Sequence, residues 1–293
     1  MGSLRLTNIM TNFFTPVQDG IHQVETLMLE QAKGNHPDLG AALDHLLSSG
    51  GKRIRPAITL LIGQMLGGDP DRLITLAAAI EMLHTATLVH DDLIDGSLLR
   101  RGIPTLNARW SPGATVLTGD FLFSRAAKMA ADTNSVEVMK IFAQTLTIIV
   151  NGEITQLFSS RCQVNRKDYY QRIYSKTASL FETASISASI IAGTNPEVVE
   201  NMRAFGYNIG MAFQIIDDIL DFTGAQATVG KPVGSDLRQG LVTLPTIYYA
   251  ETHPDESDIR TLFTGQCEDN YEAISRLVER SEEHTSELQS HSF

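Results

Sequence analysis

Two short acidic clusters are the residues of this chain whose types and spacing could do chemistry. Each cluster reads Asp-Asp-x-x-Asp at the end of an apolar run, and the six residues are Asp91, Asp92, Asp95, Asp217, Asp218 and Asp221. On a helix, the first and last aspartates of a cluster share one face, where their charges repel unless a cation lies between them. Carboxylate oxygens suit Mg²⁺, which proteins usually share with substrate phosphates. A single such cluster is more often a solvated helix face, but two copies predict clusters that face each other across a cavity and bind Mg²⁺.

Basic residues stand in a fixed order around the first acidic cluster. The loop Gly50-Gly51-Lys52-Arg53-Ile54-Arg55-Pro56 precedes it, and Arg100-Arg101-Gly102 follows it by five residues. A guanidinium fork together with an ammonium suits a diphosphate. The alternative for the arginine pair is a local salt bridge to the neighbouring aspartates.

The elements that must position these residues are predicted to be helices. Apolar residues recur every three or four positions, for example at Leu73, Leu76, Ala77 and Ile80, and the runs 136–157, 169–192 and 198–221 are long and apolar-striped. Period-two alternation, which is typical of strands, is scarce. Glycine and proline clusters such as 67–70 and 193–196 interrupt the helices without resembling a domain linker. These patterns predict one all-α domain of about ten helices.

Composition limits the partners and the compartment. The chain has 293 residues, 43% of them hydrophobic, and a formal net charge of −11, which argues against nucleic acid as a partner. The two cysteines, Cys162 and Cys267, have no metal-ligand spacing and indicate a reducing compartment. Glu81, His84 and Glu153 interrupt the longest apolar runs, so we expect no transmembrane segment and a cytoplasmic protein.

Taken in order, these motifs carry a family resemblance. The series GGKRxRP, DDxxD, RRG, KT, FQxxDDxxD and GK resembles that of the trans-isoprenyl diphosphate synthases, the polyprenyl synthetase family, over residues 27–275. The resemblance implies an all-α, isoprenoid-synthase-type helical bundle around a central cavity, spanning residues 1–279 and usually forming a homodimer. It also implies a Mg²⁺-dependent prenyltransferase that condenses isopentenyl diphosphate head-to-tail with an allylic diphosphate. A lipid product would require at most a transient contact with a membrane.

The resemblance implies a role for each matching residue. The metal ligands would be the six aspartates of the two clusters, with Asp218 the least direct. The isopentenyl diphosphate site would comprise Lys52, Arg55, His84 and Arg101. The allylic diphosphate site would comprise Arg100, Lys176, Thr177, Gln214 and Lys231. The catalytic residues would be Asp91, Asp92, Asp95, Arg100, Lys176, Asp217, Asp221 and Lys231.

Product length would depend on the helix that precedes Asp91. In the family, a bulky residue four or five positions upstream stops chain growth; here these positions hold Thr87 and Ala86, and Ala79 lies about two turns (~10 Å) further down. Small residues there predict an open tunnel and a long-chain all-trans polyprenyl diphosphate. The alternative is a floor formed by Met82 or Leu83, which would give geranylgeranyl diphosphate.

Two features depart from the family pattern. Leu241 stands where many members carry a second lysine, and Arg238 is the candidate replacement. Residues 280–293 resemble the translation of a sequencing-library adapter, so we expect a non-native tail and truncated C-terminal helices; an ordinary polar tail is the alternative.

Three other functions fit these motifs less well than the prenyltransferase does. A terpene cyclase or a head-to-head condensing enzyme would not need the second diphosphate site that GGKRxRP and RRG imply. A non-catalytic synthase subunit would typically lack one aspartate motif, whereas both are intact here.

Overall fold

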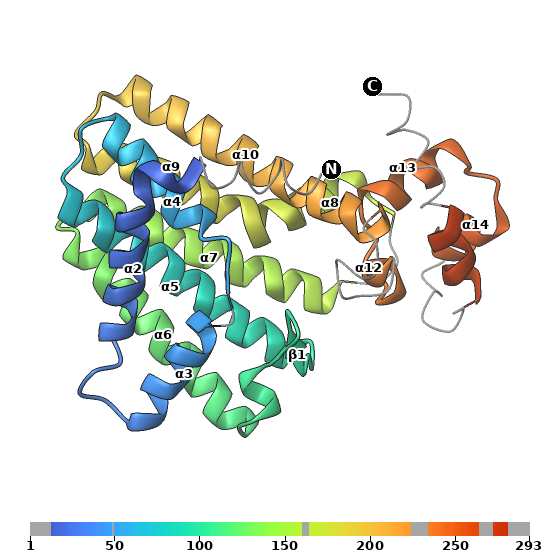
Figure 1. Ribbon diagram of the computed structural model, residues 1–293. Helices are drawn as coiled ribbons and strands as arrows, with labels where there is room; N and C mark the ends of the chain where they lie inside the picture. Colours follow the sequence, from blue (N-terminus) through green and yellow to red (C-terminus); the bar gives the residue numbers. More distant parts are fainter. Residues whose placement is uncertain (1–12, 49, 160–163, 224–233, 264–271, 281–293) are drawn as a thin grey trace. The chain divides into compact units, whose positions relative to one another are not determined.

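The computed structural model is almost wholly helical, as the sequence predicts (Figure 1). It describes residues 13–48, 50–159, 164–223, 234–263 and 272–280. Lys231, both cysteines and residues 281–293 of the predicted tail lie outside these ranges. The described chain forms two compact units, one within Met1–Thr147 and Leu180–Tyr207 and the other within Ile148–Ser179 and Asn208–Phe293, and each unit is considered by itself.

The first unit contains most of the long helices. Its elements are η1 (Thr15–Val17), α2 (Gln18–Glu30), α3 (Pro37–Ser48), α4 (Ile54–Met65), α5 (Pro70–Ile94), the strands β1 (Leu99–Arg100) and β2 (Ile103–Pro104), η2 (Leu106–Ala108), α6 (Pro112–Asp132), most of α9 (Ser179–Ile191) and the first parts of α7 (Val136–Phe158) and α10 (Pro196–Thr223). The two strands pair as a small antiparallel hairpin, which the scarcity of strand patterns did not predict.

Helix α5 packs against α2, α4 and α6 and carries the first aspartate motif at its end (Figure 1). It starts where the Asp69 side chain accepts a hydrogen bond from the Arg72 amide at 2.9 Å, with Pro70 in the first turn. The predicted stripe of Leu73, Leu76, Ala77 and Ile80 is fully buried. Its middle part is buried on all sides, as expected of a helix in the interior of a bundle.

The length and composition of α5 bear on the expected absence of a transmembrane segment. Among the described residues, this one helix is long and apolar enough to cross a membrane, although Glu81 and His84 lie within it. In the structure, 67% of its most apolar window is buried inside the protein, which is the environment of a core helix.

Close helix packing in the first unit depends on Gly206 of α10. A Cβ atom at this position would lie 2.6 Å from the Phe181 carbonyl oxygen and 2.6 Å from the Ser185 Oγ on α9. Such distances are shorter than van der Waals contact, and one of the close atoms belongs to the backbone. The two helices can therefore approach this closely only because residue 206 has no side chain.

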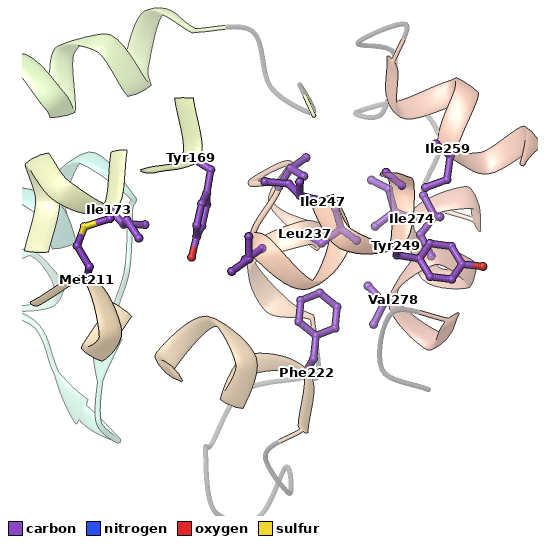
Figure 2. Close-up of a cluster of buried hydrophobic side chains, with 14 of the residues drawn as sticks. Tyr169, Ile173, Met211, Phe222, Leu237, Ile247, Tyr249, Ile259, Ile274 and Val278 are labelled. Atoms are coloured by element: carbon purple, nitrogen blue, oxygen red, sulfur yellow. The ribbon is translucent and has the colours of Figure 1, made fainter. Parts of the chain in front are cut away.

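The second unit has its own hydrophobic core. It is formed by the remaining parts of α7 and α10 together with α8 (Arg166–Ile173), the π-helical segment η3 (Tyr174–Ala178), α12 (Ser235–Arg238), α13 (Leu244–Thr252), α14 (Ser257–Phe263) and helical residues 272–280. Tyr169, Phe222, Leu237 and Ile247 belong to a cluster of buried apolar side chains (Figure 2). The apolar run 169–192 is thus helical, but its helices α8 and α9 are joined through a π-helical turn.

We predict that Gly206→Ala lowers the free energy of unfolding by roughly 1–3 kcal/mol, because the added methyl group must displace the α9 backbone. Gly40→Ala on α3 is the matched control, since a Cβ there meets no atom within 4 Å; we expect it to be neutral or to stabilise by up to about 1 kcal/mol. Urea unfolding of the two variants measures the difference. Equal effects of both substitutions would contradict the close approach of α9 and α10.

Candidate active site

The three carboxylates of the first aspartate motif have different environments at the end of α5. Asp92 is buried (6% exposed), whereas Asp91 is half-buried and Asp95 is exposed. Both oxygens of Asp92 accept hydrogen bonds from the Arg100 Nε, at 2.9 and 3.0 Å, and Arg100 Nη2 lies 2.8 Å from Asp92 Oδ1. The local salt bridge considered from the sequence therefore exists. The Arg100 charge balances that of the middle carboxylate, while Asp91 is half-buried and Asp95 is exposed to solvent.

The β1–β2 hairpin positions Arg100 over the end of α5. Arg100 pairs with Ile103 across the hairpin, and the turn between them contains Arg101 and Gly102, both with positive φ angles (54° and 78°). The Arg101 Nη1 donates a hydrogen bond to the Gly50 carbonyl, so the hairpin also contacts the GGKR loop.

His84, two turns before Asp91 on α5, lies in a cluster of arginines. Its imidazole is half-buried, and loss of hydration together with the charges of Arg55, Arg100, Arg101 and Arg53 holds the pKa of His84 well below its usual value. A neutral imidazole can donate one hydrogen bond to a phosphate oxygen without adding a charge. The structure thus brings together three of the four residues predicted to bind isopentenyl diphosphate: Arg55, His84 and Arg101. The fourth, Lys52, is exposed in the same loop.

Arg55 carries an unused hydrogen-bond donor in this cluster. Its buried Nε atom has no hydrogen-bond partner among the described residues, and its guanidinium carbon lies 4.7 Å from the centre of the Phe181 ring. Burial lowers the pKa of Arg55 to about 10, which still leaves the side chain charged at neutral pH. A buried donor without a partner is costly, and an anion bound here would satisfy it.

Arg53 is a residue of this site that sequence reasoning missed. Its backbone has a φ angle of 46°, and its side chain donates hydrogen bonds to Glu25 (2.7 Å), Glu81 (3.1 Å) and the Leu47 carbonyl (3.2 Å). These bonds fix the GGKR loop against α2 and α5. The sequence signal for Arg53 was Glu81, which lies in the apolar run of α5. A glutamate buried there requires a cation nearby.

The second aspartate motif has the same arrangement in the second unit. Asp218 is buried (4% exposed), Asp217 is exposed and Asp221 is half-buried. Asp218 accepts hydrogen bonds from the Tyr169 hydroxyl at 2.7 Å and from Gln214 Nε2 at 2.8 Å. Burial raises the pKa of Asp218 to about 6, against the lowering effect of these two bonds.

Lys176 and Thr177 lie on the π-helical segment η3. Lys176 Nζ forms an ion pair with Glu153 at 3.0 Å, and the Thr177 hydroxyl donates to Gln214 Oε1 at 2.8 Å. Two of the residues predicted to bind the allylic diphosphate, Thr177 and Gln214, are thereby joined to Asp218, whereas Lys176 contacts α7. Single π-turns inside helices frequently occur at functional sites.

Leu241 lies in the wall of a cavity of about 450 Å³ in the second unit. Polar groups of α7 and α8, among them Asn151, Gln171 and Arg172, line the same cavity. Arg238, the candidate replacement for the missing lysine, donates to the Ser275 hydroxyl at 3.1 Å. Arg172 also lies near Leu241, because both line this cavity and Arg172 Nη2 donates to the carbonyl of the adjacent Val242 at 2.6 Å.

The donor chemistry of both motifs fits Mg²⁺ through carboxylate oxygens. Within the described part of the chain, no group of three or more histidine, cysteine, aspartate or glutamate side chains forms a complete metal cage. Mg²⁺ does not need one, because it typically keeps several waters and is bound through one or two carboxylates plus substrate phosphates. The outer aspartates, Asp91 and Asp95 in the first motif and Asp217 and Asp221 in the second, are half-buried or exposed and are the candidate carboxylates.

Comparison with known proteins settles the family. A sequence model of the polyprenyl synthetase family matches residues 36–280. The chain belongs to the polyprenyl synthetase family. It is therefore a prenyltransferase, the enzyme class that the sequence motifs predicted.

Individual relatives of this family are similar over most of their length. Heptaprenyl diphosphate synthase component 2 of Geobacillus stearothermophilus is 40% identical over 233 residues, which are 79% of this chain and 73% of the relative. Geranylgeranyl diphosphate synthase of Saccharolobus solfataricus is 36% identical over 262 residues, 86% and 79% of the two chains. The crystal structure of a Caulobacter crescentus polyprenyl synthase complexed with calcium and isoprenyl diphosphate has a TM-score of 0.85 and 35% identity, covering 96% of this chain and 88% of that one.

The low pKa of His84 predicts a specific pH dependence of stability. Below about pH 6.5 the unfolded chain binds a proton at this histidine and the folded protein does not, so the folded state loses stability as the pH falls. Relative to His84→Gln, the wild type should lose up to about 1.4 kcal/mol more between pH 7.5 and 5.5. Chemical unfolding at both pH values measures this, with exposed His22→Gln on α2 as the control. If the wild type and His84→Gln respond equally to pH, the environment assigned to His84 is wrong.

Proposed function

We propose that this prenyltransferase is a Mg²⁺-dependent synthase that condenses isopentenyl diphosphate with an allylic diphosphate to give a long-chain all-trans polyprenyl diphosphate. The observation that carries the proposal is the arginine cluster around neutral His84, beside the half-buried Asp91 and the exposed Asp95. In this cluster, Arg55 Nε has no hydrogen-bond partner among the described residues. This arrangement provides an anion site of its own next to a metal site. A cyclase, which acts on one diphosphate, does not need both.

Each group has a role in the proposed reaction. Arg55, Arg101 and neutral His84 would hold the diphosphate of isopentenyl diphosphate, with Lys52 at the exposed edge. Arg100 and Lys176 would stabilise the negative charge that grows on the departing pyrophosphate, replacing water with fixed charges. Lys231 keeps the role at the allylic diphosphate that the family resemblance gives it. We assign no protein base, since the released pyrophosphate can accept the proton lost after condensation.

Mg²⁺ is proposed to be held by Asp91 and Asp95 in the first motif and by Asp217 and Asp221 in the second. When bound, it would act as a Lewis acid on the diphosphate oxygens and as a template for the substrates. Asp92 and Asp218 are each bonded to a protein donor, which supports a less direct role for both. The calcium and isoprenyl diphosphate in the Caulobacter crescentus structure support a hard cation for this family member too.

The proposed product length depends on α5. Ala79 and Ala86 are fully buried small residues, and Thr87 is half-buried with its hydroxyl bonded to the His84 carbonyl at 2.8 Å. No bulky side chain occupies these positions, which supports a long product. Met82 and Leu83 are also fully buried, so geranylgeranyl diphosphate stays the alternative. The names of the relatives include both heptaprenyl and geranylgeranyl synthases and do not decide between these products.

A homodimer in the cytoplasm is the proposed state of the enzyme. In the second unit, α7 exposes an apolar stripe of Val150, Ile154, Leu157 and Phe158, the last 87% exposed. A contiguous exposed apolar surface typically marks an interface. The name "component 2" of the Geobacillus stearothermophilus relative supports a different subunit as the alternative partner.

The test of the proposed function is a turnover assay. Purified protein is incubated with Mg²⁺, isopentenyl diphosphate and farnesyl diphosphate, with and without EDTA, and the products are separated by length after dephosphorylation. We expect metal-dependent products longer than twenty carbons. Products that stop at twenty carbons would replace the long-chain proposal with the geranylgeranyl alternative. The absence of any product, from a protein that is folded by circular dichroism, would contradict the catalytic proposal and favour a non-catalytic subunit.

We predict that Ala86→Phe shortens the products by several isoprene units, because the ring would block a tunnel that passes α5. Ala86→Val should give an intermediate length. Since Ala86 is fully buried, overpacking can cost about 1–3 kcal/mol, so thermal melting must accompany the assay. Thr87→Phe, at a half-buried position, is the second variant should Ala86→Phe not fold. Unchanged product length in a folded Phe variant would contradict the tunnel assignment.

A further inference from the structure

A row of four side chains in the second unit connects groups of the proposed site. The Thr177 hydroxyl donates to Gln214 Oε1 at 2.8 Å, and Gln214 Nε2 donates to Asp218 Oδ1 at 2.8 Å. The Tyr169 hydroxyl donates to the other Asp218 oxygen at 2.7 Å. Thr177, Gln214 and Asp218 are residues that the sequence assigned to the site. Tyr169, at the end of the row, has no assigned role.

The ring of Tyr169 is held firmly in place. It is 1% exposed and belongs to the hydrophobic cluster of the second unit (Figure 2). It meets the Tyr170 ring edge-on at 5.3 Å, and the guanidinium carbon of Arg172 lies 5.6 Å from its centre. Arg172 is in turn bonded to the Val242 carbonyl at 2.6 Å. Because the ring cannot move, its hydroxyl is a fixed donor for Asp218.

The position of Asp218 affects the direction in which the carboxylates of Asp217 and Asp221 point. Asp218 is the middle residue of the cluster, and both of its oxygens are bonded inside the protein. Asp217 and Asp221, four residues apart on α10, occupy the neighbouring face and are exposed and half-buried. A residue that anchors Asp218 therefore helps to set the rotation of this end of α10 and, with it, the direction of the two outer carboxylates. Asp221 Oδ2 also accepts a hydrogen bond from the Asp236 amide at 3.2 Å.

Packing alone does not explain a tyrosine at position 169. A phenylalanine would fill the same volume in the cluster, and a buried hydroxyl is favourable only when it has a partner. Its partner here is a carboxylate that is itself buried and requires donors. The first motif has a corresponding arrangement, since Arg100 bonds both oxygens of Asp92. In each motif, the middle carboxylate thus has a dedicated donor.

We propose that Tyr169 is a positioning residue of the second aspartate motif: its hydroxyl fixes Asp218 and thereby orients Asp217 and Asp221 toward the divalent cation of the allylic diphosphate. This inference rests on the proposed function, because it gives the outer carboxylates the role of cation ligands. Tyr169 itself touches no substrate in this scheme.

The test compares Tyr169→Phe with the wild type in two measurements. The first is the binding of Mn²⁺ in the presence of inorganic pyrophosphate, followed by electron paramagnetic resonance, which does not require turnover. We expect binding about 10-fold weaker in Tyr169→Phe, as is typical when a residue that orients metal ligands is removed. The second is steady-state kinetics. We expect kcat to fall about 10-fold while KM for isopentenyl diphosphate is unchanged, because the proposed site for that substrate lies in the first unit.

Two controls separate positioning from a general loss of structure. Tyr170→Phe makes the same chemical change at the adjacent, partly buried ring. This variant should bind Mn²⁺ and pyrophosphate like the wild type. In an Asp218→Asn background, Tyr169→Phe should have little further effect on Mn²⁺ binding, because the two residues act through one hydrogen bond. Thermal melting of the wild type and the four variants verifies that they are folded.

The outcomes decide separately on the inference and on the proposed function. Wild-type-like Mn²⁺ binding and kcat in Tyr169→Phe would overturn the inference, as would equal effects of the substitution in both backgrounds. A rise in KM for isopentenyl diphosphate equal to the fall in kcat would point to a general structural role and also overturn it. If the wild type has no turnover but Tyr169→Phe still weakens Mn²⁺ binding, the inference stands and the proposed function fails.

Discussion

The repulsion between carboxylates on one helix face is the constraint on which this structure depends. Three aspartates within five residues would destabilise a helix end unless their charges were balanced. Both motifs meet the problem in the same way: the middle aspartate turns inward and is bonded to a donor, Arg100 in one case and Tyr169 in the other. The outer aspartates of each motif are half-buried or exposed, so a cation bound by them as proposed would reduce the remaining repulsion. Binding of the cation would then also stabilise the helix end.

Two short connections, the GGKR loop and the β1–β2 hairpin, bring the arginines to the first motif on α5. The cationic cluster forms because the GGKR loop and the β1–β2 hairpin converge on α5, and both loops contain residues with positive φ angles, Arg53 and Arg101. Arg53 is fixed by two glutamates, while Arg55 keeps a donor unused. Arg53 thus holds the loop in place, and Arg55, two residues later, is the arginine proposed to bind an anion. The neutral state of His84 follows first from its loss of hydration and then from the combined charge of the surrounding arginines.

Much of this could be predicted from the sequence, and the exceptions have physical reasons. The helical period of Leu73, Leu76, Ala77 and Ile80 identified α5, because burial on a helix leaves a repeating pattern. The aspartates and arginines stood out since clustered charges beside apolar runs are costly without a function. Tyr169 did not, because an aromatic residue on an amphipathic helix resembles any core residue until its hydroxyl partner, 49 positions away, is known. The hairpin was missed because two strands of two residues each cannot show alternation.

The π-helical turn at Tyr174–Ala178 limits which mutations this region can tolerate. A π-turn amounts to one extra residue in an α-helix, and side chains beyond it are rotated by about 100° relative to an uninterrupted helix. Substitutions in this segment can be tolerated one by one, whereas a single-residue deletion would restore the regular helix and shift the register of everything on one side of it. Lys176 and Thr177 would then no longer face Glu153 and Gln214 together. The length of this segment is therefore under stricter constraint than most of its residue types.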